Sequence, residues 1–142
     1  MPMARTEATN HLYEQLAAFA RRARSLSAAI HPELSLVAFT LLAHVAREAD
    51  VRAADLAEHY ALDRSTVSRQ LDVLEARGLL RRGAERPGRR GHVLELTPRG
   101  TQVLAAADKS LQNRLAERLA PWSDADVASL ADLLTRFNST FD

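Results

Sequence analysis

The side chains best suited to chemistry in this sequence stand between residues 64 and 77, and they are mainly hydrogen-bond donors. Ser65, Arg69 and Asp72 follow each other at four- and three-residue steps, so on a helix they would share one ridge. An arginine can donate two hydrogen bonds to O6 and N7 of guanine, while serine and threonine hydroxyls bind phosphates or base edges. We therefore expect contact with duplex DNA through Arg64, Ser65, Thr66, Ser68 and Arg69.

Positive charge is concentrated in the same part of the chain. Residues 64–90 hold eight arginines against three acidic residues, although the formal net charge of all 142 residues is only +1. A local excess of this kind is the electrostatic footprint of a phosphate-binding surface. Arginine is common throughout the sequence, so the charge by itself would also fit a solvated surface.

Three of these arginines, Arg86, Arg89 and Arg90, surround a Pro-Gly dipeptide. Pro-Gly is typical of a turn, and the residues on either side predict short strands over about 79–83 and 93–96. A basic hairpin tip can enter the minor groove of DNA, where the concentrated negative potential favours guanidinium groups. All three arginines are therefore candidates for contact with DNA.

The elements that must position these groups are mostly helical. Apolar residues recurring at three- and four-residue steps predict helices over about 7–30, 35–48, 53–59 and 64–77. A short helix, a tight turn, a second helix and then a basic hairpin form the order of a winged helix-turn-helix, whose second helix lies in the major groove. Asp63 is expected to cap that second helix with its carboxylate, and Gly78 to end it in the left-handed conformation.

The chain after the hairpin predicts two more helices. Thr97-Pro98 is typical of a helix start with threonine as the N-cap. Ser123 is expected to cap the last helix, and Ser35 to cap the helix over about 35–48. The last helix is expected to bury its apolar residues, which are Val127, Leu130, Leu134, Phe137 and Phe141.

The succession of these motifs resembles the MarR family of bacterial regulators. The resemblance is carried by Leu62-Asp63-Arg64-Ser65-Thr66-Val67-Ser68-Arg69, by Leu71-Asp72-Val73-Leu74-Glu75-Ala76-Arg77-Gly78-Leu79-Leu80-Arg81, and by Leu94-Glu95-Leu96-Thr97-Pro98-Arg99-Gly100. It implies a single domain over 1–142 that is mostly α with a small β-hairpin wing. A winged helix-turn-helix core over 34–100 would be flanked by long dimerisation helices within 1–33 and 101–142.

The resemblance also implies an activity and partners. We expect a sequence-specific transcriptional regulator, namely a homodimeric, ligand-responsive repressor that binds a pseudo-palindromic operator in double-stranded DNA. Two half-sites about one DNA turn apart would be read by two recognition helices. The alternative is a winged-helix module that binds proteins and has no sequence-specific DNA binding. The sequence does not separate a repressor from an activator.

The sequence departs from the family pattern at two positions. Gly88 stands where the family usually has an aspartate, and that aspartate normally orients an arginine two residues on, here Arg90. Which of the three wing arginines enters the minor groove is therefore left open. Arg52 stands where the family favours threonine or serine at the start of the short helix, so that helix is capped by Asp50 or only weakly capped.

Family members often release DNA when a small aromatic or anionic effector enters a cleft between the dimerisation helices and the winged core. The candidates for such a cleft, each of which also fits an ordinary core or surface role, are His11, Tyr13, His31, Phe39 and His44. The five histidines show no spacing of the His-x-x-x-His kind, so we expect no metal site and no cofactor.

Several other classes are disfavoured. The sequence has no cysteine, which excludes disulfides and thiolate chemistry. We find no glycine-rich phosphate loop, nucleophile motif or catalytic carboxylate pair, so an enzyme is not expected. No run approaches the roughly 18 apolar residues of a membrane span, and the first residues lack the apolar segment of a signal peptide. The expected compartment is the cytoplasm.

Overall fold

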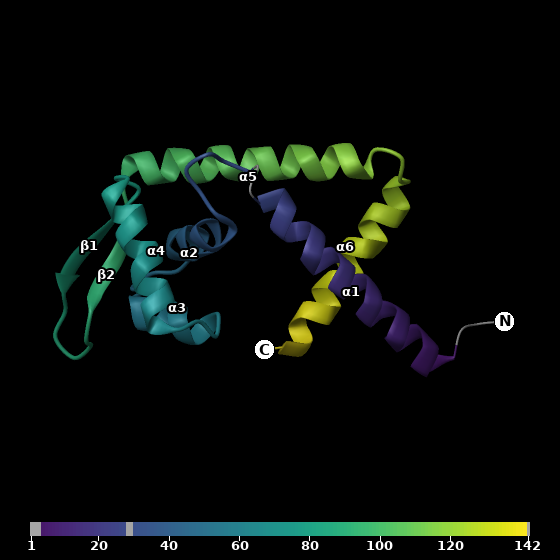
Figure 1. The fold of residues 1–142 in the computed structure, drawn as a ribbon, viewed down its shortest axis with the longest axis horizontal. Coiled ribbons are helices and arrows are strands. Elements are labelled where there is room, and N and C mark those ends of the chain that lie inside the picture. Colours follow the sequence, from purple (N-terminus) through teal and green to yellow (C-terminus); the bar gives the residue numbers. More distant parts are fainter. Residues whose placement is uncertain (1–3, 28–29, 142) are drawn as a thin grey trace. The chain divides into compact units, whose positions relative to one another are not determined.

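The computed structural model describes residues 4–27 and 30–141 (Figure 1). The elements are α1 (Arg5–Ser27), α2 (Leu36–Arg47), α3 (Ala53–His59), α4 (Arg64–Ala76), β1 (Leu80–Glu85), β2 (His92–Leu96), α5 (Pro98–Leu119), α6 (Asp124–Asn138) and the short 3-10 helix η1 (Ser139–Phe141). The expectation of a mostly helical chain with one small hairpin is confirmed. The expected end of the first helix near residue 30 falls partly on residues 28 and 29, outside the described residues.

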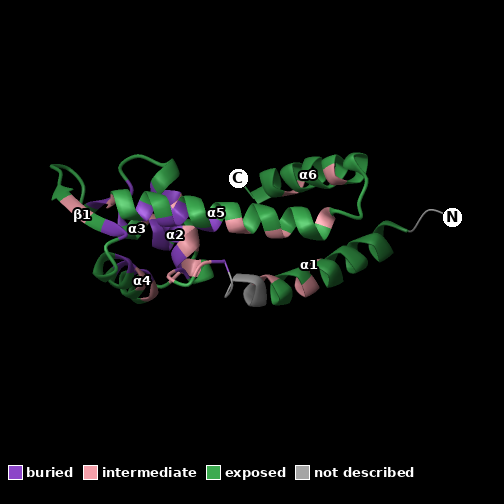
Figure 2. Ribbon diagram, turned by 90° about the horizontal axis from the view of Figure 1, so that it is seen from above, coloured by how far each residue is buried: buried purple, intermediate pink, exposed green. Residues whose placement is uncertain are grey.

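The chain divides into two compact units, Met1–Asp108 and Lys109–Asp142. In the first unit, buried side chains gather on α2, α3, α4, the hairpin and the start of α5 (Figure 2). Val67, Leu71 and Leu74 are fully buried, so the apolar residues at three- and four-residue steps that predict this helix form its inner face. Burying a side chain of this size stabilises the fold by about 1.5–3 kcal/mol, which fixes the rotation of α4 and turns its polar face outward.

Most of the expected helix ends are confirmed. The hydroxyl of Ser35 accepts a hydrogen bond from the Ala38 N–H at 3.1 Å, and those of Thr97 and Ser123 accept from the third residue beyond them at 2.9 and 3.1 Å. Gly78 has φ 71°, the left-handed conformation predicted for it. The prediction for Asp63 is wrong in one respect, because its exposed carboxylate makes no capping hydrogen bond and water can solvate it instead.

The hairpin is antiparallel and is joined to the helix-turn-helix by the chain just before α3. Leu80 pairs with Leu96, and the pairing becomes irregular between Arg82 and Glu85. The Leu94 N–H donates a hydrogen bond to the Val51 carbonyl at 2.8 Å. The entry to α3 therefore lies beside β2, and it brings the residues around position 50 next to the wing.

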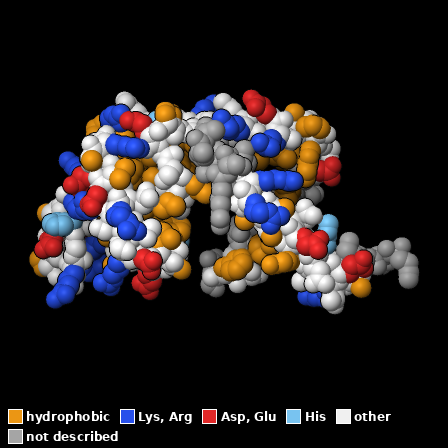
Figure 3. Space-filling view, viewed as in Figure 1, with side chains coloured by type: hydrophobic (Ala, Val, Ile, Leu, Met, Phe, Trp, Pro, Cys, Tyr) orange, Lys and Arg blue, Asp and Glu red, His pale blue; other side chains and the backbone are white. Residues whose placement is uncertain are grey.

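We expected the apolar face of the last helix to be buried, and within a single chain this prediction is wrong for α6. No residue of α6 is buried, and Leu130, Leu134 and Phe141 are 37%, 44% and 75% exposed. Figure 3 shows apolar side chains gathered near the C-terminal end of this helix. The physical reason is that no element within the described part of the second unit covers this stripe.

Among residues 4–27 and 30–141, no helix combines the length and the hydropathy needed to cross a bilayer.

Gly100 forms a tight joint between the start of α5 and Leu79, the residue directly before β1. A Cβ atom at this position would lie 1.9 Å from the carbonyl oxygen of Leu79, which is far inside van der Waals contact. The Thr97 hydroxyl donates a hydrogen bond to the Gly78 carbonyl beside it. Only glycine allows the two backbones to approach this closely.

We expect Gly100→Ala to lower the free energy of unfolding by about 3 kcal/mol, the upper part of the range for overpacked sites, because backbone must move to admit the methyl group. Thr101→Ala, at the exposed neighbouring position, should change it by less than about 0.5 kcal/mol. Urea unfolding of both variants and the parent measures the difference. Equal stability of the two variants would contradict the close approach.

Candidate nucleic-acid interface

The outward face of α4 carries the polar residues predicted to meet DNA. Arg64, Ser65, Ser68 and Arg69 are exposed, and Thr66 is half-buried. The Arg69 guanidinium lies 3.5 Å from the Thr66 hydroxyl, at the limit of a hydrogen bond, and no carboxylate in the described residues pairs with it. Its donors are therefore free for another acceptor, such as a base edge.

The acidic residues of α4 are engaged with the wing. Arg82 on β1 forms two ion pairs of 2.9 Å, one with Asp72 and one with Glu75. One guanidinium thus holds two carboxylates that lie three residues apart on one helix face. This fork fixes the hairpin against α4 and partly neutralises the acidic end of the helix.

A pocket between α4 and the wing brings together three of the predicted residues, Arg64, Ser68 and Arg90. Arg82 and His92 also line it. Within the described residues, neither Arg64 nor Arg90 has a hydrogen-bond or ion-pair partner. Two unpaired guanidinium groups beside a hydroxyl suit the geometry and charge of a phosphate.

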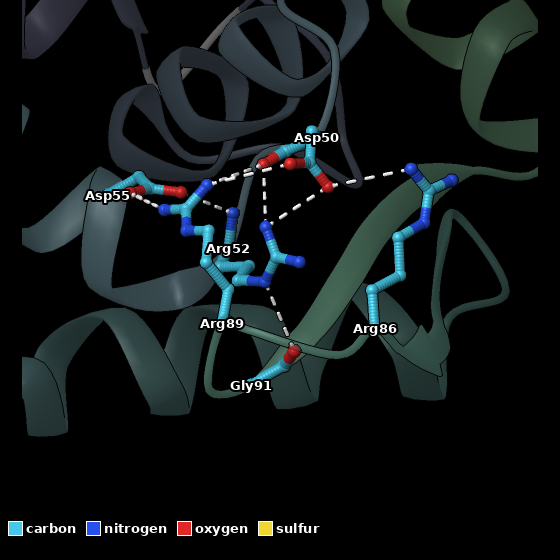
Figure 4. A network of polar contacts seen from close by, with 6 residues as sticks. All are labelled: Asp50, Arg52, Asp55, Arg86, Arg89 and Gly91. Atoms are coloured by element: carbon cyan, nitrogen blue, oxygen red, sulfur yellow. Dashed lines mark hydrogen bonds and ion pairs between the residues drawn. The ribbon is translucent and has the colours of Figure 1, made fainter.

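The three wing arginines differ in their surroundings, and Figure 4 shows two of them, Arg86 and Arg89. Arg89 forms an ion pair with Asp55, donates a hydrogen bond to the Asp50 carbonyl at 3.3 Å and lies 3.7 Å from the Asp50 carboxylate. Arg86 lies 3.9 Å from the same carboxylate, at the outer limit of an ion pair. The Arg90 side chain has no such partner among residues 4–27 and 30–141, so it is the least constrained of the three.

Arg52, at the entry to α3, is the buried member of this network and is only 2% exposed. Its guanidinium lies 3.0 Å from the Asp50 carboxylate, and it donates to the Asp50 carbonyl and to the Gly91 carbonyl, both at 3.2 Å. Its backbone N–H donates to Asp55 at 2.9 Å, which caps α3. The hydrogen bond from Arg52 holds the pKa of the Asp50 carboxyl below its usual range. We call Asp50, Arg52, Asp55 and Arg89 the wing clamp.

The sequence interpretation missed this clamp and the Arg82 fork. It considered Arg52 only as a poor helix cap and left the capping by Asp50 open, whereas Asp55 performs the capping. The available signal was the spacing of Asp50, Arg52 and Asp55, which places two carboxylates beside one arginine. That spacing does not indicate that the partner is a wing arginine 34 residues further along the chain.

The five effector candidates lie in different surroundings. His44 is buried with its Nδ1 3.0 Å from the Tyr60 hydroxyl, and burial, followed by the charge of His59, lowers the pKa of His44. Phe39 is partly buried against the core, and the His31 ring accepts a hydrogen bond from the Glu33 N–H. His11 and Tyr13 are exposed on α1, and His11 and His44 line different pockets.

The chain is similar to known regulators in both sequence and structure. A sequence profile of the MarR family matches residues 33–91. An uncharacterised HTH-type transcriptional regulator of Bacillus subtilis, YxaD, is 32% identical over 72% of each chain. The transcriptional regulator BldR from Sulfolobus solfataricus, whose crystal structure is known, is 27% identical in sequence to this chain. The two structures match with a TM-score of 0.73 over 94% of this chain and 99% of BldR.

The fold is also that of a MarR family protein from Bacillus stearothermophilus, with a TM-score of 0.84 over 98% of this chain and 99% of that one, at 19% identity. The α4 face and the basic pocket beside it lie on the winged helix-turn-helix of this fold. The chain belongs to the MarR family and is a DNA-binding transcriptional regulator.

Proposed function

We propose that this protein is a homodimeric repressor that reads a pseudo-palindromic operator, with α4 in the major groove and the wing beside it. The observation that carries the proposal is the outward face of α4, where exposed short side chains surround Arg69, an arginine that no carboxylate of the described chain contacts. Arg69 would donate to guanine O6 and N7, while Ser65 and Ser68 are short enough for α4 to approach the base edges. Bound at a promoter, such a dimer would block transcription.

The wing would add contacts in the adjacent groove. Arg90 is exposed, has no partner in the described part of the chain, and lines the same pocket as Arg64 and Ser68. A guanidinium at this position can reach a phosphate or the narrow minor groove beside the helix. We therefore assign the wing contact to Arg90 rather than to Arg86 or Arg89, whose donors face carboxylates.

The partner proposed for the apolar helices is a second copy of the chain. Each unit exposes large apolar side chains, which in α1 are Leu12, Tyr13 and Phe19, and in the second unit are Leu111, Leu115, Trp122, Leu130, Leu133, Leu134 and Phe141. Exposed apolar surface on this scale marks an interaction site. Two copies related by a two-fold axis would bury it and would present two α4 helices to half-sites about 34 Å apart.

Response to a small aromatic or anionic effector is part of the proposal. It rests on family membership, and the candidate residues remain His11, Tyr13, His31, Phe39 and His44. Because His11 and His44 line different pockets, a single effector would contact only some of the five in this arrangement.

We expect Arg69→Ala to weaken binding to an operator selected from random duplexes by about 5- to 150-fold for each half-site, the equivalent of one bidentate base contact per protomer, and to relax the preference at one position of each half-site. Arg118→Ala, which removes the same charge in the second unit, is the matched control and should retain the selected sequence. Repeating the selection with each variant measures both effects. Failure of the wild-type protein to enrich any sequence would favour the protein-interaction module.

We expect Leu134→Glu to give a monomer with much weaker operator binding, because a carboxylate on the apolar stripe of α6 would be buried in the dimer. Ala128→Glu adds the same charge at an exposed position about 120° around α6 from Leu134, outside the apolar stripe, and should remain dimeric. Sedimentation equilibrium gives the oligomeric state, and circular dichroism verifies that both variants are folded. A dimeric Leu134→Glu protein would place the dimer contact elsewhere.

A further inference from the structure

We propose that Asp50 and Asp55 are positioning residues for the wing, because they hold Arg89 and thereby present the neighbouring Arg90 to DNA. The inference rests on the proposed function, since it assigns separate tasks to adjacent arginines of the DNA-binding surface. Arg89 would be part of the scaffold, and Arg90 would be the wing residue that touches DNA.

The contacts of Arg89 carry the first step. Its guanidinium reaches three oxygen groups, namely the Asp55 carboxylate in the first turn of α3 and the carbonyl and carboxylate of Asp50 just before this helix (Figure 4). A single exposed ion pair contributes little, but three acceptors around one planar guanidinium restrict its position far more than one does. The side chain therefore spans from the wing tip to the helix-turn-helix.

Arg52 supplies a second attachment on the other side of Arg90. Its buried guanidinium donates to the Gly91 carbonyl at 3.2 Å and is itself held by the Asp50 carboxylate at 3.0 Å. Arg90 thus lies between Arg89, which is held through its side chain, and Gly91, which is held through its backbone carbonyl. Its own side chain has no partner in the described residues and lines the pocket with Arg64.

These attachments matter because the wing tip is intrinsically pliable. Gly88 and Gly91 both have φ of 90°, a conformation that glycine reaches without steric cost but from which it also departs readily. No atom of the described residues beyond its chain neighbours lies within 4 Å of the Cβ position of Gly88, so packing does not restrain the chain at this residue. The carboxylates of Asp50 and Asp55 provide the restraint from outside the hairpin.

The opposite interpretation is that the two carboxylates compete with DNA for Arg89. The structure favours positioning, because Asp55 also accepts the hydrogen bond that caps α3 and Asp50 also pairs with the buried Arg52. Both carboxylates are therefore fixed by the fold, whereas Arg64 and Arg90 are available to phosphate without breaking any contact. The two interpretations predict opposite effects of removing a carboxylate.

Asp55→Asn is the most selective variant. The amide oxygen can still accept from the Arg52 N–H and cap α3, while the amide nitrogen replaces the oxygen that faces Arg89 and cannot accept from it. We compare it with Arg89→Ala, the double variant and Arg90→Ala. Binding to the selected operator is measured over a range of salt concentrations, because the salt slope counts the phosphates neutralised.

We expect Arg90→Ala to reduce the slope by about 0.9 for each wing. Asp55→Asn and Arg89→Ala should each weaken binding by about tenfold or less while leaving the slope unchanged, and the double variant should bind no more weakly than either single one. Tighter binding by Asp55→Asn, or a reduced slope in Arg89→Ala equal to that of Arg90→Ala, would overturn the proposal in favour of competition. Additive losses in the double variant would also overturn it.

A measurement without DNA separates this inference from the proposed function. Amide hydrogen exchange of residues 86–91 in the free protein should accelerate in Asp55→Asn and in Arg89→Ala. It should stay unchanged in Arg81→Ala, which removes the cross-strand ion pair with Glu95 but none of the clamp. Unchanged exchange in the clamp variants would refute the positioning role even if the operator is bound normally. Accelerated exchange together with no operator binding by the wild type would refute the proposed function alone.

Discussion

The guanidinium of Arg52 carries a full positive charge at a site only 2% exposed, and the arrangement of the wing depends on how that charge is satisfied. A buried charge must be paired and hydrogen-bonded to persist in a fold. Here the partners come from the chain before α3 and from the wing, namely the Asp50 carboxylate and the carbonyls of Asp50 and Gly91. Satisfying one side chain therefore joins the helix-turn-helix to the hairpin, alongside the hydrogen bond from Leu94 to Val51.

The other ionic contacts of the region extend the same framework. Arg82 attaches the base of the hairpin to α4 through two carboxylates, while Arg89 attaches its tip to the entry of α3. Once these pairs are formed, the cations left without a carboxylate partner in the described part of this surface include Arg64, Arg69 and Arg90. All of these arginines have the same side-chain chemistry. The positions of the acidic residues therefore decide which arginines are paired within the fold and which are left for DNA.

Periodicity and local motifs were enough to predict the fold, because the information they use is local. The bounds of α3, the buried face of α4 and the left-handed Gly78 were all predicted correctly. The wing clamp could not be predicted, because Arg89 and Asp55 meet only after the chain has folded. The burial of α6 was wrong for a related reason: an apolar stripe predicts that a face will be covered but not whether the covering surface belongs to the same chain. The DNA and effector residues remain predictions.

The close approach at Gly100 has a mechanical consequence. Because the backbone of α5 touches that of Leu79 with no side chain between them, and Thr97 bonds to Gly78, the joint between the end of α4 and the start of α5 has almost no slack. A packed joint of this kind transmits a displacement instead of absorbing it. A tilt imposed on the beginning of α5 would therefore move Gly78 and Leu79, and through them the end of α4, instead of being taken up at the joint.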